Sequence, residues 1–94
     1  MKRDRDFDTI IKQCQQFAKA VEATREAAKL LKKEAAVAAA TLKDDVSQKN
    51  IAKVDNLSET ILKKTATGLE RVRELEKKTR DAKEHYDHLR DQGR

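Results

Sequence analysis

Apolar residues recur at alternating spacings of three and four along the first half of the chain. Counted from Phe7, this spacing selects Phe7, Ile10, Cys14, Phe17, Val21, Thr24, Ala28, Leu31, Ala35, Ala38 and Leu42, and only Thr24 among them is polar. An amphipathic α-helix has this period, whereas a half-buried strand alternates at every second residue. The pattern predicts a helix over residues 7–43. Asp4, Asp6 and Asp8 favour a helix N-terminus near its start.

The same spacing returns in the second half and predicts a second helix over residues 51–91. It selects Ile51, Val54, Ser58, Ile61, Thr65, Gly68, Val72, Leu75, Thr79, Ala82, Tyr86 and Leu89. The first stripe, continued beyond Leu42, meets mostly polar residues, so the two stripes are out of phase. We therefore predict a turn over residues 44–50, where Asp45 and Gln48 have the spacing of a capping box. A continuous bent helix is the alternative, because this segment has neither proline nor glycine.

A turn in this segment brings the two stripes face to face. It pairs Phe7 with Tyr86 and Leu31 with Ile61, and it sets Thr24 against Gly68 at a narrow waist. The expected fold is all-α, a single domain over residues 1–94 built as a coiled-coil-like antiparallel helical hairpin. The largest side chains of the expected intramolecular seam are Phe7, Ile10, Phe17, Val21, Leu31, Ile61, Val72, Leu75 and Tyr86.

Further apolar residues lie outside the first stripe or widen the second. A two-helix hairpin has a thin core, and helices in water are stabilised mainly by packing. We therefore expect these residues to contact another helical protein or a second copy of the chain, completing a four-helix bundle. The residues predicted for this partner interface are Leu30, Val37, Leu57, Leu62 and Leu69.

Charge and composition narrow the class of partner. Charged residues make up 41% of the chain, and a net charge of +5 results from 22 basic and 17 acidic residues that are interspersed. Such mixing is typical of solvated long helices. All three aromatic residues fall on the predicted seam and leave no stacking platform, so nucleic-acid binding is disfavoured. No apolar run approaches the roughly 20 residues that cross a bilayer, so we expect a cytoplasmic chain without membrane insertion.

The residues that could carry chemistry form no recognisable active site. Cys14 lies within the apolar stripe and is interpreted as a buried structural thiol. His85 and His88 have acidic neighbours but no third fixed ligand, so a solvated polar face is preferred to a metal site. No phosphate-binding glycine loop or nucleophile beside a base is present. We expect no enzymatic activity and no cofactor.

In size, alanine content, hairpin pattern and spare apolar surface, the chain resembles the small secretion-partner proteins of the bacterial type VII system. That group includes the Trp-x-Gly hairpins and the helical partners of LXG toxins. The turn here has neither tryptophan nor glycine, and Tyr86 is followed four residues later by Arg90, where the family's tail motif has an acid. The resemblance implies a targeting chaperone that binds a helical domain of a secreted toxin or effector, with export independent of a signal peptide. A structural coiled-coil scaffold or homo-oligomerisation subunit is the alternative.

Overall fold

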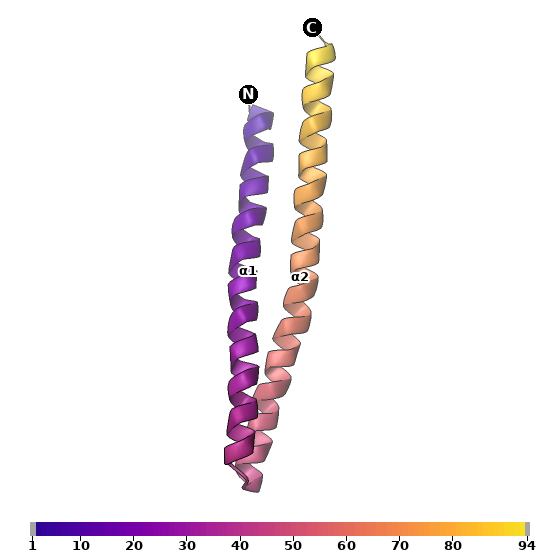
Figure 1. The fold of residues 1–94 in the computed structure, drawn as a ribbon. Helices are drawn as coiled ribbons and strands as arrows, with labels where there is room; N and C mark the ends of the chain where they lie inside the picture. The colour runs from indigo at the N-terminus through magenta and orange to yellow at the C-terminus, as the bar shows by residue number, and fades with distance from the viewer. Residues whose placement is uncertain (1, 94) are drawn as a thin grey trace. The chain divides into compact units, whose positions relative to one another are not determined.

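Two long α-helices make up the fold. The computed structural model describes the backbone of residues 2–93 and the side chains of residues 6–93. Helix α1 spans Lys2–Thr41 and helix α2 spans Asp45–Gln92, and the part of the chain described contains no strand (Figure 1). The helices pack against each other as a hairpin. The predicted all-α helical hairpin is confirmed.

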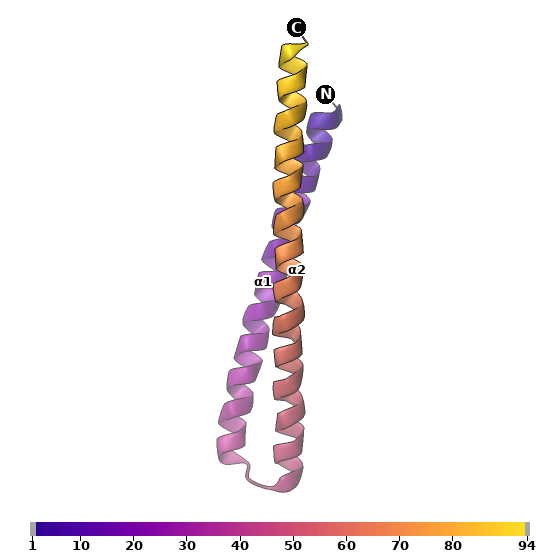
Figure 2. The same cartoon turned by 90° about the vertical axis from the view of Figure 1, so that its right-hand side faces the viewer.

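The connection between the helices is shorter than the predicted turn at residues 44–50. Between the two helices, only residues 42–44 are not helical, as the loop in Figure 2 shows. The Leu42 amide donates to the Ala38 carbonyl at 2.8 Å, which closes the last turn of α1. The side-chain amide of Gln48 donates to the carbonyls of Ala39 and Leu42. These bonds satisfy carbonyls that a helix end leaves without partners, without a glycine in the turn.

The N-cap of α2 is Asp44 rather than the predicted Asp45. A carboxylate oxygen of Asp44 accepts a hydrogen bond from the Ser47 amide at 2.9 Å, which is the bond of an N-cap residue to the third helical position. The hydrogen bonds from Ser47 lower the pKa of the Asp44 carboxyl below its ordinary value of 3.8. Gln48 is not the capping-box partner, because its side chain reaches back to α1.

The described residues group into two compact units, each with a segment of both helices. The first unit comprises the described parts of Met1–Ala20 and Leu69–Arg94, and the second comprises Val21–Gly68. In the first unit the rings of Phe7 and Tyr86 lie with their centroids 6.0 Å apart, which confirms that predicted pair. In the second unit Arg25 donates to the Thr65 hydroxyl at 3.0 Å.

In much of α1 and in the C-terminal part of α2, one of the two buried positions in each heptad is the residue after the predicted stripe residue. In α1 the packed positions are Ile11, Ala18, Arg25 and Lys32, whereas Ile10, Phe17, Thr24 and Leu31 are exposed. In α2 the stripe residues from Ile51 to Val72 are buried or partly buried as predicted. Beyond them Glu76, Lys83 and Arg90 are partly buried, whereas Leu75, Ala82 and Leu89 are exposed. One residue along a helix corresponds to a rotation of about 100°, and only one of the two positions shifts, so the seam in these segments is turned by part of that angle to one side of the apolar stripe.

Small residues form the centre of the seam. Cys14, Ala28 and Ala35 of α1 are buried, as are Ser58 and Thr79 of α2. The Ser58 hydroxyl donates to the Val54 carbonyl at 3.0 Å, and the Thr79 hydroxyl donates to the Leu75 carbonyl at 2.8 Å. These bonds to the preceding helical turn allow hydroxyl groups to be buried without a partner on the opposite helix.

The predicted waist between Thr24 and Gly68 is wrong. No heavy atom outside the local helix backbone lies within 4 Å of the position that a Cβ on Gly68 would occupy. Gly68 therefore does not permit a close approach of the two backbones. Within the described residues, neither helix combines the length and apolar character needed to span a membrane.

Candidate protein-interaction surface

The first unit has an apolar groove between its two helix segments. Cys14 and Val72 lie at its base, because both occupy seam positions that are largely covered. Phe17 and Leu75 form its walls and keep 53% and 51% of their surface exposed. The groove has a volume of about 250 Å³ and is lined by Ile10, Gln13, Cys14, Phe17, Val72 and Leu75. An open apolar groove of this kind accommodates an apolar side chain or helix face.

The second unit has an apolar hollow of its own. This hollow has a volume of about 260 Å³ and lies among Glu34, Ala35, Ala38, Asn50, Ile51 and Val54. Alanines on α1 face larger aliphatic side chains on α2, so the floor is shallow and made mainly of carbon. Leu57 is exposed and follows Val54 by three residues, which places it beside the hollow on the same side of α2.

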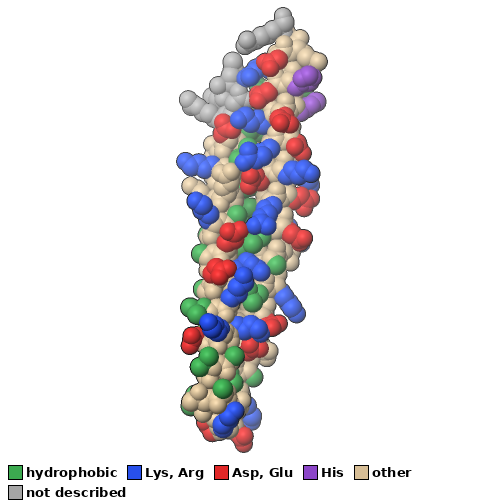
Figure 3. Space-filling view, viewed as in Figure 1, with side chains coloured by type: hydrophobic (Ala, Val, Ile, Leu, Met, Phe, Trp, Pro, Cys, Tyr) green, Lys and Arg blue, Asp and Glu red, His purple; other side chains and the backbone are tan. Residues whose placement is uncertain are grey.

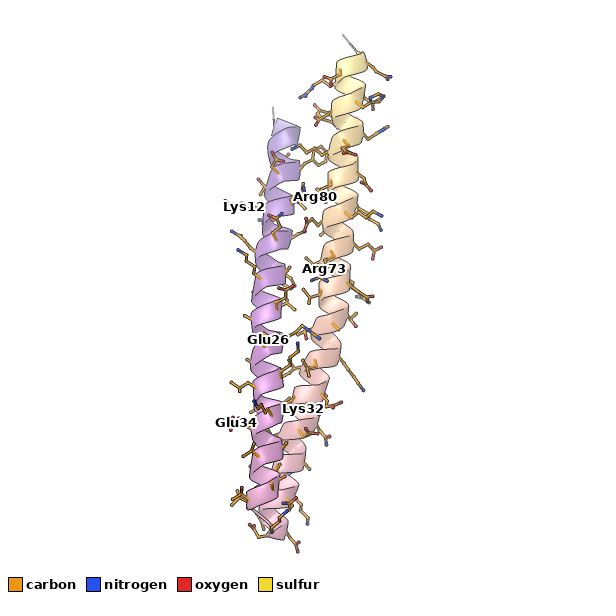
Figure 4. The ribbon with its side chains drawn as sticks, in the orientation of Figure 1. Lys12, Glu26, Lys32, Glu34, Arg73 and Arg80 are labelled. Carbon is orange, nitrogen blue, oxygen red and sulfur yellow. The ribbon has the colours of Figure 1, made fainter. Side chains whose placement is uncertain are left out.

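The other side of the seam is polar in both units. In the first unit the Lys83 ammonium lies 2.6 Å from an Asp8 carboxylate oxygen. In the second unit Lys32, on the side of α1 that faces α2 (Figure 4), lies 3.1 Å from Asp55 and also pairs with Glu59. The hydrogen bonds from Lys32 to Glu59 and Asp55 raise the pKa of its ammonium above 10.5. Charged pairs thus bridge the helices on one side, and apolar side chains remain uncovered on the other.

The partner-interface residues predicted from sequence fall into three groups. Leu30, Val37 and Leu57 are exposed, whereas Leu62 is half-buried. Leu69 is only 7% exposed, so the prediction that it lies off the intramolecular seam is wrong. Leu69 occupies a packed position because the seam of α2 is rotated toward it.

Leu30 and Val37 lie on the back of α1. They are seven residues apart and share a face, and each follows a buried alanine by two residues. Two residues correspond to a rotation of about 200°, so both side chains point away from the seam and from the grooves beside it. Leu30 and Val37 therefore do not extend the apolar groove surface.

Because the packed face is rotated, some of the predicted seam residues are partly buried and others are exposed. Val21, Ile61 and Val72 are partly buried, like Phe7 and Tyr86. Ile10, Phe17, Leu31 and Leu75 are exposed, so the prediction that they are buried in the seam is wrong.

The positions of charged residues in the sequence indicate which side of the apolar stripe remains exposed. Lys32 is followed 23 and 27 residues later by Asp55 and Glu59, and in a hairpin these charges face one another. Oppositely charged residues that face one another in a hairpin indicate the side on which ion pairs bridge the helices. The apolar residues on the other side of the stripe are then expected to remain exposed.

The residues considered for thiol chemistry and for metal binding differ in their exposure. Cys14 is a free, buried cysteine, and His85 and His88 are exposed. Both histidines are visible near the end of α2 in Figure 3, where acidic and basic side chains are interspersed over the visible face. Among the described residues there is no group of three or more potential ligands that could hold a metal ion.

Comparison with protein-family models, with curated proteins and with solved structures finds no match to this chain.

Proposed function

We propose that the chain is a non-catalytic protein–protein interaction module and that a helix of another protein packs into the groove of the first unit. The exposure of Phe17 and Leu75 above an apolar floor carries this proposal. Burial of the exposed half of each side chain would contribute on the order of 1 kcal/mol per residue. The two helices of the hairpin supply half of a four-helix bundle, and a helical partner supplies the rest.

The partner in this proposal is a helical domain of an exported toxin or effector, and the chain acts as its targeting chaperone. This part of the proposal draws on the resemblance to type VII secretion partners. The hairpin supports it physically, since a two-helix surface with an open groove suits a helical target better than a compact globular one.

The test is affinity capture of a tagged chain from its native host, followed by mass spectrometry of the captured proteins. Wild type is compared with the double variant Phe17→Glu/Leu75→Glu, which places carboxylates against apolar surface in the bound state. The matched control is Leu30→Glu/Val37→Glu, which changes the net charge equally on the back of α1. We expect the control and wild type to retain a helical partner that the groove variant loses.

Two results would count against the proposal. Retention of the same partner by the groove variant would place the interface elsewhere. Sedimentation equilibrium on the purified chain addresses the scaffold alternative. Stable self-association that the groove variant abolishes, together with capture of no other helical protein, would identify a homo-oligomerisation subunit instead. Circular dichroism of each variant checks that the helices still form.

A further inference from the structure

The groove of the first unit has a basic rim on its α2 side. Arg71 precedes Leu75 by four residues and Lys78 follows it by three, so both lie next to this wall of the groove on the surface of α2. Both side chains are exposed. Lys78 pairs with Glu74 at 3.2 Å, while Arg71 has no hydrogen bond or ion pair with any residue that the structure describes. A ligand in the groove would therefore lie beside Arg71, which is not paired with a described residue, and beside Lys78, whose ammonium it would share with Glu74.

The opposite rim, on α1, carries no charge next to these cations. Gln13 precedes Phe17 by four residues, and Ala20 follows it by three, so they occupy the corresponding positions on α1. Gln13 lines the groove itself. Asp6, seven residues before Gln13, lies at the end of the unit where Phe7 meets Tyr86. The groove is thus basic along one edge and neutral along most of the other.

This asymmetry disfavours a second copy of the chain as the occupant. Two copies can pack with their grooves facing each other about a twofold axis. The α2 rim of one copy then lies against either the α2 rim or the α1 rim of the other copy. The first arrangement sets two rims against each other that each carry Arg71, Glu74 and Lys78, and hence a net positive charge. The second sets this rim against Gln13 and Ala20, which carry no carboxylate. Neither arrangement brings the net positive rim against a net negative surface, whereas a separate protein with acidic residues does.

We propose that the groove of the first unit binds an amphipathic helix with an acidic flank, oriented so that its carboxylates lie beside Arg71 and Lys78. Apolar residues of this helix fill the space between Phe17 and Leu75. Acidic residues seven positions apart are spaced by about 10.5 Å, the same rise that separates Arg71 from Lys78. The inference rests on the proposed function and specifies the chemistry of the partner at that site.

The probes are two synthetic helical peptides about three heptads long, identical in their leucine face, with either glutamate or lysine along one flank. Binding of each labelled peptide to the full chain is measured by fluorescence anisotropy at low and high salt. We expect the acidic peptide to bind roughly threefold to tenfold more tightly at low salt, with the difference shrinking as salt screens the exposed charges.

Charge reversal on the chain tests the contact directly. Arg71→Glu/Lys78→Glu should reverse the preference, so that the basic peptide binds more tightly than the acidic one. The matched control is Lys12→Glu/Lys19→Glu, because these lysines are also seven residues apart and each precedes a seam residue by two, away from the groove. This control makes the same change in net charge and should retain the preference for the acidic peptide.

The outcomes separate the inference from the proposed function. Equal binding of both peptides, an equal effect of the two charge reversals, or no binding of either peptide would overturn the acidic-helix inference. Capture of a helical partner that depends on Phe17 and Leu75 would leave the proposed function standing in each of these cases. Self-association through the groove that is indifferent to Arg71→Glu/Lys78→Glu would identify a second copy as the occupant and overturn the inference.

Discussion

Gly68 lies inside α2 with open space where its side chain would be. Glycine in a helix interior is less favourable than alanine because it loses more backbone freedom on folding. We predict that Gly68→Ala raises the free energy of unfolding by about 0.5–1 kcal/mol, measured by thermal or urea denaturation followed by circular dichroism. A loss of stability would instead indicate that another group occupies this space.

Asp44 gives the chain a pH-dependent element at the start of α2. Because its pKa is lower in the folded state, its contribution to stability is present above the ordinary value of 3.8 and is lost as pH falls through the folded value. We predict that Asp44→Ala lowers the Tm at neutral pH, and that the difference in Tm from wild type narrows in acid. Thermal melts from neutral pH to about pH 2 measure this, with Asp45→Ala as the control. A constant difference would contradict the N-cap assignment.

At the scale of the helix, the two leucines Leu69 and Leu75 distinguish the observed seam from the predicted one. Leu69 is buried and Leu75 is half exposed in the groove. We predict that Leu69→Ala costs about 2–4 kcal/mol of stability, whereas Leu75→Ala costs less than about 1 kcal/mol in the isolated chain. Chemical denaturation of both variants provides the comparison. The reverse order would restore the seam expected from the apolar stripe.

Sequence periodicity predicts the two helices and most of the seam positions, but not the rotation of the packed face in α1 and beyond Val72 in α2. Cys14, Val21, Ala28 and Ala35 belong to both the predicted and the observed seam, because they occupy the position shared by the two stripes. The second position of each heptad could be apolar Phe17 or its neighbour Ala18. Hydrophobicity alone favours Phe17 at the seam. The seam instead contains Ala18, because small residues and cross-helix ion pairs determine which side of α1 faces α2. The candidate groove follows from that rotation, so the stripe alone did not reveal it.

The pairing of the two helices has a chemical test in the second unit. A water-soluble carbodiimide joins an amine to a neighbouring carboxylate without a spacer, and Lys32 lies within 3.1 Å of Asp55 while also pairing with Glu59. We predict an amide cross-link from Lys32 to one of these acids, found by peptide mass spectrometry within single chains. Lys32→Arg removes the reactive amine and should abolish this cross-link. A link found only between isotopically distinct chains would contradict the intramolecular hairpin.

At the scale of the whole molecule, each of the two units has a polar side and an apolar side. In each unit one side is held together across the helices by polar contacts, Asp8 with Lys83 in the first and Lys32 with Asp55 in the second. The other side presents an apolar groove or hollow. In our proposal the closed side holds the two helices in register, and the open side of the first unit binds a third helix. This division leaves apolar side chains exposed in each unit.

The central claim, that a partner helix covers the groove of the first unit, is tested most directly by the reactivity of a thiol placed on the groove lining. Gln13 lines the groove and is exposed, whereas the native Cys14 is buried, so the reporter is Gln13→Cys in a Cys14→Ser background. Its alkylation rate is measured in the free chain and in the complex captured from the native host. The control is Leu30→Cys in the same background, which reports on the back of α1. Our account predicts that the partner slows alkylation at position 13 by roughly tenfold or more and leaves the control thiol unchanged. Equal reactivity at position 13 with and without the partner would contradict it.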